Sequence, residues 1–184
     1  MALSSPLKPT SRPIELRVKE VGQLFHTLDP LPFRERDLDA AVEAYVVGWA
    51  RELPGDRAIN IVVHLPKEEA EHEDAGHIGD AMRNYFAYRA EVVGWDLKEL
   101  FRVGRVSLLI GLGVLATCVV AARLVGSALG PGYLGGFFNE GLIILGWVAN
   151  WRPVQIFLYD WWPLARRRRL FRRLATAGIE LRSY

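Results

Sequence analysis

Apolar and polar side chains follow two different periods in the first third of the chain. Residues 14–18 alternate between the two kinds, as a half-buried strand does. Residues 59–65 form a nearly continuous apolar run, which is typical of a central strand covered on both faces. Between these segments, Asp37 is a good N-cap for a helix over residues 38–53. The apolar residues of this helix recur at helical spacing: Leu38, Val42, Tyr45, Trp49 and Leu53.

A much longer helical pattern begins after Pro66. Before it, residues 21–28 predict only a short helix, ended by the turn-rich residues 29–32. Beyond Pro66 the sequence is first acidic and then carries an apolar stripe at helical spacing. Because no proline follows until Pro131, we expect one helix to run from about His77 into the apolar segment beyond. The stripe comprises Met82, Tyr85, Phe86, Arg89, Val93, Leu97 and Phe101.

Two apolar segments in the second half of the chain predict transmembrane helices. Seventeen uncharged residues lie between Arg105 and Arg123, and as a helix they cover roughly 25 Å, just short of a bilayer core. We therefore extend the first span to residues 104–126, with Arg123 reaching outward to the interface. A buried core helix is the alternative. However, a second apolar stretch of similar length follows a Gly/Pro break at residues 130–132, which favours a two-helix hairpin.

The second span, over residues 135–159, is less uniform. Glu140 lies near its start, within about 6 Å of the outer boundary, and Arg152 lies near its end, directly before a proline. In a competing interpretation the helix ends at Trp151, and residues 154–159 lie in the headgroup plane. In the full crossing, an aromatic belt is formed by Trp151, Tyr159, Trp161 and Trp162.

The formal net charge of +2 conceals an asymmetry that sets the expected orientation. Residues 1–99 carry a net charge of −6, and residues 100–184 carry +8. Basic residues flank both spans at the ends away from the connecting loop, whereas that loop, over residues 124–139, holds no Lys or Arg. Because Lys and Arg mark the cytoplasmic side, we expect both termini in the cytoplasm, at a bacterial-type inner membrane. The polar residues 1–13 predict a disordered arm rather than a signal peptide.

The basic segment after the second span predicts contact with anionic lipid headgroups. Its arginines follow the aromatic belt and are interleaved with apolar residues, which favours lipid over nucleic acid. A plain topology signal is the alternative. The predicted interfacial residues are Arg105, Trp161, Trp162, Arg166, Arg167, Arg168, Arg169, Arg172 and Arg173.

Charged residues within the spans, and one face of small residues, are further candidates. Charge is expensive inside a bilayer, so an intramembrane role is one interpretation of these residues and an interfacial position is the other. They are Arg123, Glu140, Arg152 and Asp160. Small residues recur every four positions and predict close helix packing, within the hairpin or between copies of the chain. They are Gly113, Thr117 and Ala121.

The sequence contains no recognisable catalytic motif. His72 and His77 are five residues apart, so on a helix their rings lie about 140° apart and do not face one ion. No nucleophile elbow, Walker loop or dinucleotide fingerprint occurs. We therefore predict no enzyme activity, no cofactor and no metal site.

One tetrapeptide occurs twice, at residues 14–17 and at residues 179–182, the second after a candidate helix C-cap at Gly178. Coincidence between two alternating strands is the alternative to a structural relation. Since both termini are expected in one compartment, we predict that the two segments belong to one sheet, with residues 59–65 between or beside them. Ile14, Leu16, Ile179 and Leu181 would then turn inward, while Glu15, Arg17, Glu180 and Arg182 face water.

These patterns predict an α+β membrane protein. A cytoplasmic α/β domain of about three strands with a helical stalk would occupy residues 14–103, a transmembrane hairpin residues 104–160, and a basic interfacial helix and C-terminal strand residues 161–184. The leading hypothesis is a non-enzymatic, membrane-anchored interaction protein, an accessory or assembly subunit. It would contact anionic lipid and a protein partner or further copies of itself. The alternatives are a homo-oligomeric channel or transporter, with Glu140 and Arg152 lining the pore, and a membrane-bound metal-dependent enzyme that uses the region of the two histidines.

Overall fold

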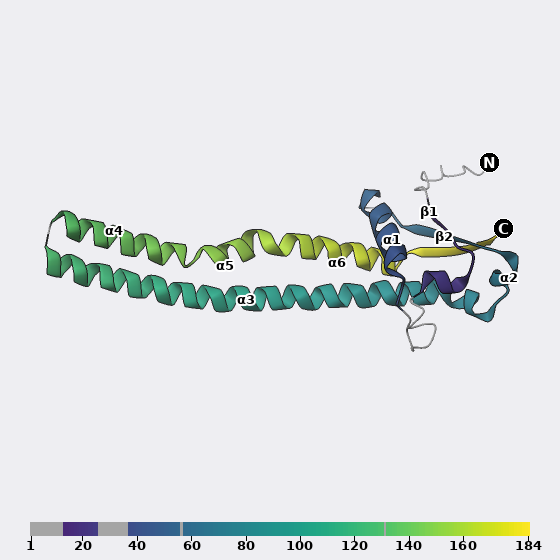
Figure 1. The fold of residues 1–184 in the computed structure, drawn as a ribbon, viewed down its shortest axis with the longest axis horizontal. Coiled ribbons are helices and arrows are strands. Elements are labelled where there is room, and N and C mark those ends of the chain that lie inside the picture. Colours follow the sequence, from purple (N-terminus) through teal and green to yellow (C-terminus); the bar gives the residue numbers. More distant parts are fainter. Residues whose placement is uncertain (1–12, 26–36, 56, 131) are drawn as a thin grey trace, which may run out of the picture. The chain divides into compact units, whose positions relative to one another are not determined.

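The computed structural model describes residues 13–25, 37–55, 57–130 and 132–184, so most of the predicted disordered arm and the predicted turn at residues 29–32 lie outside the described residues. The chain divides into two compact units, one within residues 1–92 together with 166–184, and the other within residues 93–165. It is mostly helical (Figure 1). In chain order the elements are β1 (Ile14–Arg17), the 3₁₀-helix η1 (Val21–Leu24), α1 (Ala40–Glu52), β2 (Asn60–Leu65), α2 (Lys67–Ala70), the 3₁₀-helix η3 (Glu73–His77), α3 (Ile78–Leu129), α4 (Tyr133–Val148), α5 (Trp151–Gln155), the π-helix η4 (Ile156–Asp160), α6 (Trp161–Ala175) and β3 (Gly178–Ser183).

The three strands form one parallel sheet in the order β1-β2-β3 (Figure 1). In the register of this sheet, Ile14 lies beside Ile61 and Ile61 beside Ile179, so the two copies of the repeated tetrapeptide flank β2 at the same height. The prediction that both segments belong to one sheet is confirmed, with residues 60–65 between them. The central strand is buried on both faces, as its continuous apolar run requires.

The core of the first unit is built from helices that are far apart in the sequence. Met82 and Phe86 of α3, Leu24 of η1, and Phe171 and Leu174 of α6 are all fully buried. The rings of Phe86 and Phe171 stack with their centroids 6.2 Å apart. The first part of the apolar stripe in the long helix therefore belongs to this core.

Helix α1 begins later than the sequence indicates, and it buries a different face. Its N-cap is Asp39, whose carboxylate accepts a hydrogen bond from the backbone N–H of Ala41 at 2.9 Å, and not Asp37. Leu38 lies before the helix, where it forms an isolated bridge with Phe25. The buried residues of the helix are Val46, Val47 and Ala50, whereas Tyr45 and Trp49 of the apolar pattern are 44% and 45% exposed.

Strand β3 also differs from its prediction in one respect. Ile179 is half-buried, but Leu181 is 39% exposed, although the alternating pattern predicted that it would turn inward. The reason is that β3 is an edge strand, so its side chains are covered on fewer sides than those of β2. The four charged residues of the two tetrapeptides face solvent, as expected. Gly178 has no left-handed backbone and opens the strand beside Asn60, so it is not a helix C-cap of the expected kind.

Helix α3 is uninterrupted over 52 residues and begins one residue after His77, which confirms the long helix expected there. It ends at Leu129, and the next residue, Gly130, has the positive φ of 71° that glycine adopts without strain. Two continuous helical stretches, Asp74–Leu129 and Tyr133–Ala175, are long and apolar enough to cross a membrane. Only 17% and 22% of their most apolar windows are buried within the protein, unlike the core helix of a soluble fold.

The second of these stretches is broken near its middle. Helix α4 ends at Val148, and Asn150 caps the short helix α5. Pro153 explains the break, since it has no N–H to donate to the carbonyl of Ala149 and its ring collides with that carbonyl in a straight helix. The chain then continues through α5 and η4 into α6.

Within residues 93–165, α4 and α5 run back along α3 at close range (Figure 1). A Cβ added at Gly146 would lie 2.7 Å from a side-chain atom of Leu115, and one added at Gly104 would lie 2.9 Å from Ile156. A Cβ added at Gly111 would lie 2.6 Å from the side-chain oxygen of Asn150. These three glycines therefore permit the close approach of the helices.

We expect Gly111→Ala to lower the free energy of unfolding by roughly 1–3 kcal/mol, because the new methyl group must displace Asn150 and the carbonyl of Ala149, 3.0 Å away. Gly113→Ala is the matched control in the same helix, since nothing lies within 4 Å of its added Cβ and alanine favours a helix. Thermal unfolding in mild detergent, followed by circular dichroism, measures both variants. Equal effects of the two substitutions would contradict the observed packing.

Candidate membrane-interaction site

The unit within residues 93–165 exposes an unusual amount of apolar surface. Single exposed apolar side chains are normal in soluble proteins, but a continuous apolar surface marks an interface with lipid or protein. On α3 the exposed large apolar residues include Val106, Leu109, Ile110, Leu112, Val114, Val120 and Leu124. On α4 they include Leu134, Phe137, Phe138, Ile143, Ile144, Leu145, Trp147 and Val148.

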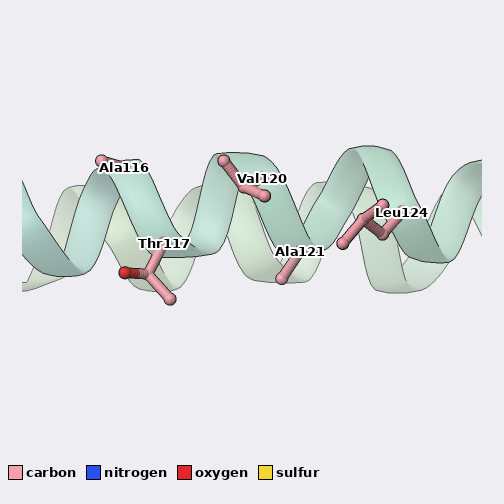
Figure 2. Close-up of a pocket in the computed structure, with 5 residues that line it drawn as sticks. All are labelled: Ala116, Thr117, Val120, Ala121 and Leu124. Atoms are coloured by element: carbon pink, nitrogen blue, oxygen red, sulfur yellow. The ribbon is translucent and has the colours of Figure 1, made fainter.

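The predicted packing face of α3 lies on this exposed surface and not against α4. Gly113 and Thr117 are exposed and Ala121 is half-buried. Thr117 donates its hydroxyl hydrogen to the carbonyl of Gly113 at 2.9 Å, so its polarity is satisfied within the helix. Figure 2 shows the side chains that line a shallow depression here: Ala116, Thr117, Val120, Ala121 and Leu124. Contact with α4 is made instead by Leu115 and Cys118, which lie against Gly146.

The four charged residues predicted within the spans fall into two groups. Arg152 and Asp160 form an ion pair of 3.0 Å across the π-helix η4. Arg152 also contacts the side-chain oxygen of Gln155 at 3.4 Å. Arg123 and Glu140 are exposed on α3 and α4. The pairing of Arg152 reduces the penalty for a charge near an apolar environment.

Asn150 is a polar residue of this unit that sequence reasoning missed. It is buried, and its amide donates hydrogen bonds to the carbonyls of Gly111 and Gly146, each at 3.0 Å. It therefore joins α3 to the break between α4 and α5. The signal for it was available, because an asparagine directly before Trp-Arg-Pro interrupts an otherwise apolar run.

The predicted interfacial residues of α6 have different surroundings. Arg173 donates to the carbonyls of Pro54 and Arg57 at 2.7 and 2.9 Å, so it holds the segment after α1. Arg167 lies over the ring of Phe171, with 5.4 Å between the guanidinium and the ring centroid, and Arg168 is half-buried. The remaining arginines of the cluster are exposed, and they are Arg166, Arg169 and Arg172.

Three of the predicted interfacial residues lie within residues 93–165. Trp161 packs against Phe101, whereas Trp162 and Arg105 are exposed. The ring of Trp161 lies 6.4 Å from that of Phe101, and its N–H donates to the carbonyl of Phe157 at 3.0 Å. An indole with an apolar contact and a satisfied N–H suits a membrane–water boundary.

A polar cluster that the sequence did not predict joins α1 to α3 in the other unit. The carboxylate of Glu43 accepts a hydrogen bond from the hydroxyl of Tyr85 at 2.6 Å and two from the guanidinium of Arg89, at 2.9 and 3.2 Å. The same guanidinium lies 5.5 Å from the ring centroid of Phe171 in α6. Arg89 was visible as the one charged residue in the apolar stripe, but its partner lies 46 positions away.

This cluster raises the pKa values of two of its members. Burial, the hydrogen bond to Glu43 and the negative charge of that residue all raise the pKa of Tyr85 well above the usual range. Burial disfavours the charge of Arg89, but the hydrogen bond and charge of Glu43 outweigh it, and the pKa of Arg89 is raised. At neutral pH the arrangement is therefore a neutral phenol and an ion pair, which is a structural clamp.

The histidines do not form a site with other ligands. Within the described part of the chain, no group of three or more His, Cys, Asp or Glu residues could hold a metal ion. His72 and His77 lie at opposite ends of η3. His64 of β2 is half-buried, and its Nε2 atom lies 3.7 Å from the carboxylate of Glu15 in β1.

The clamp predicts a loss of stability at alkaline pH. The pKa of Tyr85 is higher in the folded than in the unfolded protein, so its contribution is fully present below the unfolded value of about 10 and is lost progressively above it. Tyr85→Phe should therefore flatten the decline in stability above about pH 10 while lowering stability by about 1 kcal/mol at pH 7. Thermal unfolding at several pH values checks this. Tyr88→Phe, in the same helix with an exposed ring, should change neither quantity.

No protein-family model matches this chain, and no curated protein or solved structure shows significant similarity to it. Its function must therefore be inferred from its own residues. The described residues offer an exposed apolar surface, a set of exposed arginines, and a packed unit with a small parallel sheet.

Proposed function

We propose that this protein is a membrane-anchored interaction protein, in which a two-helix transmembrane hairpin carries a small cytoplasmic α/β unit that binds a partner protein. The observation that supports this most is the contrast between its two units. Within residues 93–165 the large apolar side chains point outward, whereas the other unit buries its apolar side chains around Phe86 and Phe171. Lipid suits the first surface, and water suits the second.

The proposed orientation rests on the distribution of charge. The segment over residues 124–139, between the two spans, contains no Lys or Arg, whereas arginines flank both spans at their other ends. Both termini would therefore lie in the cytoplasm, and the connection between α3 and α4 would face outward. That connection is too short to hold a domain, so any partner would bind on the cytoplasmic side.

Exposed arginines on α6 support a contact with anionic lipid. Arg166, Arg169 and Arg172 follow Trp161 and Trp162 in the same helix, and none of the three guanidinium groups makes a hydrogen bond or ion pair to another described residue. Basic side chains next to interfacial aromatic residues attract phosphate-bearing headgroups. Arg173 is occupied with backbone carbonyls and would contribute less.

The orientation is tested with reporter fusions in a bacterial host. A reporter that is active only in the cytoplasm should be active when fused after Tyr184, and a reporter that is active only outside should be active when inserted at Gly132. Each reporter should be inactive at the other position. An external Tyr184 would refute the two-span topology.

The lipid contact is tested by removing exposed arginines. Because each basic residue at an anionic surface contributes about 1 kcal/mol, Arg166→Gln with Arg169→Gln should weaken the binding of short-chain phosphatidylglycerol by about fivefold for each residue removed. Native mass spectrometry in detergent, with phosphatidylcholine as the reference lipid, measures this. Arg173→Gln is the matched control and should instead lower thermal stability, since it frees two carbonyls. Equal lipid binding by all variants would rule out this contact.

A further inference from the structure

Strand β3 leaves one side of its backbone without partners. Its pairing with β2 extends to both ends of the strand, since the N–H of Gly178 donates to the carbonyl of Ile59 and that of Tyr184 to the carbonyl of Leu65, both at 3.0 Å. Backbone groups alternate in direction along a strand, so those of Ile179, Leu181 and Ser183 point away from β2. Among the described residues, including the nearby helix α2, none hydrogen-bonds to these outward groups.

The opposite edge of the sheet is partly closed. The outward carbonyl of Glu15 in β1 accepts a hydrogen bond from the hydroxyl of Tyr45 at 3.3 Å, so α1 covers this position. The two copies of the tetrapeptide thus have different surroundings, and in the part of the chain that the structure describes, β3 is the edge with room for a further strand.

Strand β3 is paired with β2 from Gly178 to Ser183, and Tyr184 fixes its C-terminal end. Beyond the backbone bond to Leu65, the hydroxyl of Tyr184 donates to the carbonyl of Val18 at 3.4 Å. The guanidinium of Arg17 lies over the Tyr184 ring, 4.4 Å from its centroid. The edge is therefore preformed, and a partner strand would not have to order it.

The side chains of this edge are arranged symmetrically about Leu181. Glu180 precedes it and Arg182 follows it, both on the solvent face, where they form an ion pair of 3.2 Å. Leu181 itself points to the other face and is 39% exposed. The charges are both more than half exposed, so this pair within one strand contributes little and can be exchanged for partners on a neighbouring strand.

We propose that β3 is a docking edge for a second copy of this chain: the two β3 strands pair antiparallel about Leu181, and each brings to the other its own acidic–apolar–basic triplet of Glu180, Leu181 and Arg182. This inference rests on the proposed function, since it names the partner protein that the cytoplasmic unit binds. In an antiparallel pair centred on Leu181, the partner's apolar residue lies opposite Leu181, its basic residue opposite Glu180, and its acidic residue opposite Arg182.

The same register satisfies the backbone. Leu181 has its N–H and C=O directed outward, so it forms a hydrogen-bonded pair with the apolar residue opposite. Glu180 and Arg182 then occupy non-hydrogen-bonded pairs, in which opposing side chains lie closest and opposite charges attract most. The partner's apolar side chain also covers the exposed part of Leu181. A register shifted by one residue would leave both the charges and the backbone groups mismatched.

The proposal is tested with peptides and the full-length protein in mild detergent. A fluorescent peptide with the sequence of residues 178–184 carries the required triplet, and its binding is followed by anisotropy. A second peptide has its Glu and Arg exchanged. We expect the first peptide to bind the natural protein about tenfold more tightly than the second, and the preference to reverse for the protein with Glu180→Arg and Arg182→Glu. These substitutions are at exposed positions, so they leave the fold intact.

Methylated peptides test the backbone pairing separately. A methyl group on the backbone nitrogen of the peptide's leucine should abolish binding, because that N–H faces β3, whereas the same group on its glutamate should be tolerated, because that N–H faces away. Equal affinities across the charge exchange, or equal effects of the two methyl groups, would overturn the proposal. So would a native mass of a single chain for the natural protein at micromolar concentration, since two complementary edges would then have failed to pair. Peptide binding needs no membrane and the reporter fusions need no peptide, so either proposal can fail alone.

Discussion

The parallel pairing of β3 with β2 is the constraint on which the rest of the chain depends. It places residues 178–183 beside residues 60–65, so whatever lies between must leave the sheet and return to it. The intervening chain does so as long helices, and only two residues separate the end of α6 from the start of β3. Because a parallel pair needs a crossover, no short turn could have joined these strands. Here the crossover contains both of the long apolar helical stretches.

The returning helices are held to α3 mainly by shape. Gly104, Gly111 and Gly146 remove the side chains that would keep the backbones apart, and Asn150 uses both of its amide hydrogens at the point of closest approach. In the proposed membrane, water cannot satisfy a broken helix, so carbonyls at the break need partners within the protein, and the carbonyl of Gly146 has one in the side-chain amide of Asn150. The asparagine lies where the break occurs, and it stabilises the bend that the proline causes.

The strands and the long helix could be predicted from sequence because each rests on a local pattern. Alternation over residues 14–17, the apolar run of β2 and the absence of proline before Pro131 are all read within one segment. The choice between Tyr45 and Val46 as core residues could not be read in that way. Both lie on apolar stripes of the same helix, and the buried stripe of Val46 is the one whose face also carries Glu43, the partner of Arg89. Long-range pairs of this kind leave no periodic signal.

An open edge strand is normally a hazard, because any exposed strand can pair with it. Strand β3 limits that hazard with Glu180 and Arg182, since a partner must lose the hydration of both charges unless it replaces it with matching ones. A generic apolar strand would bury the two charges without compensation, and a strand in the opposite charge order would repel them. The same two residues that make the edge soluble therefore make it selective. This also gives a physical reason why Leu181 is exposed beside them: without an apolar contact at the centre, charge matching at the surface alone would be too weak to hold a partner.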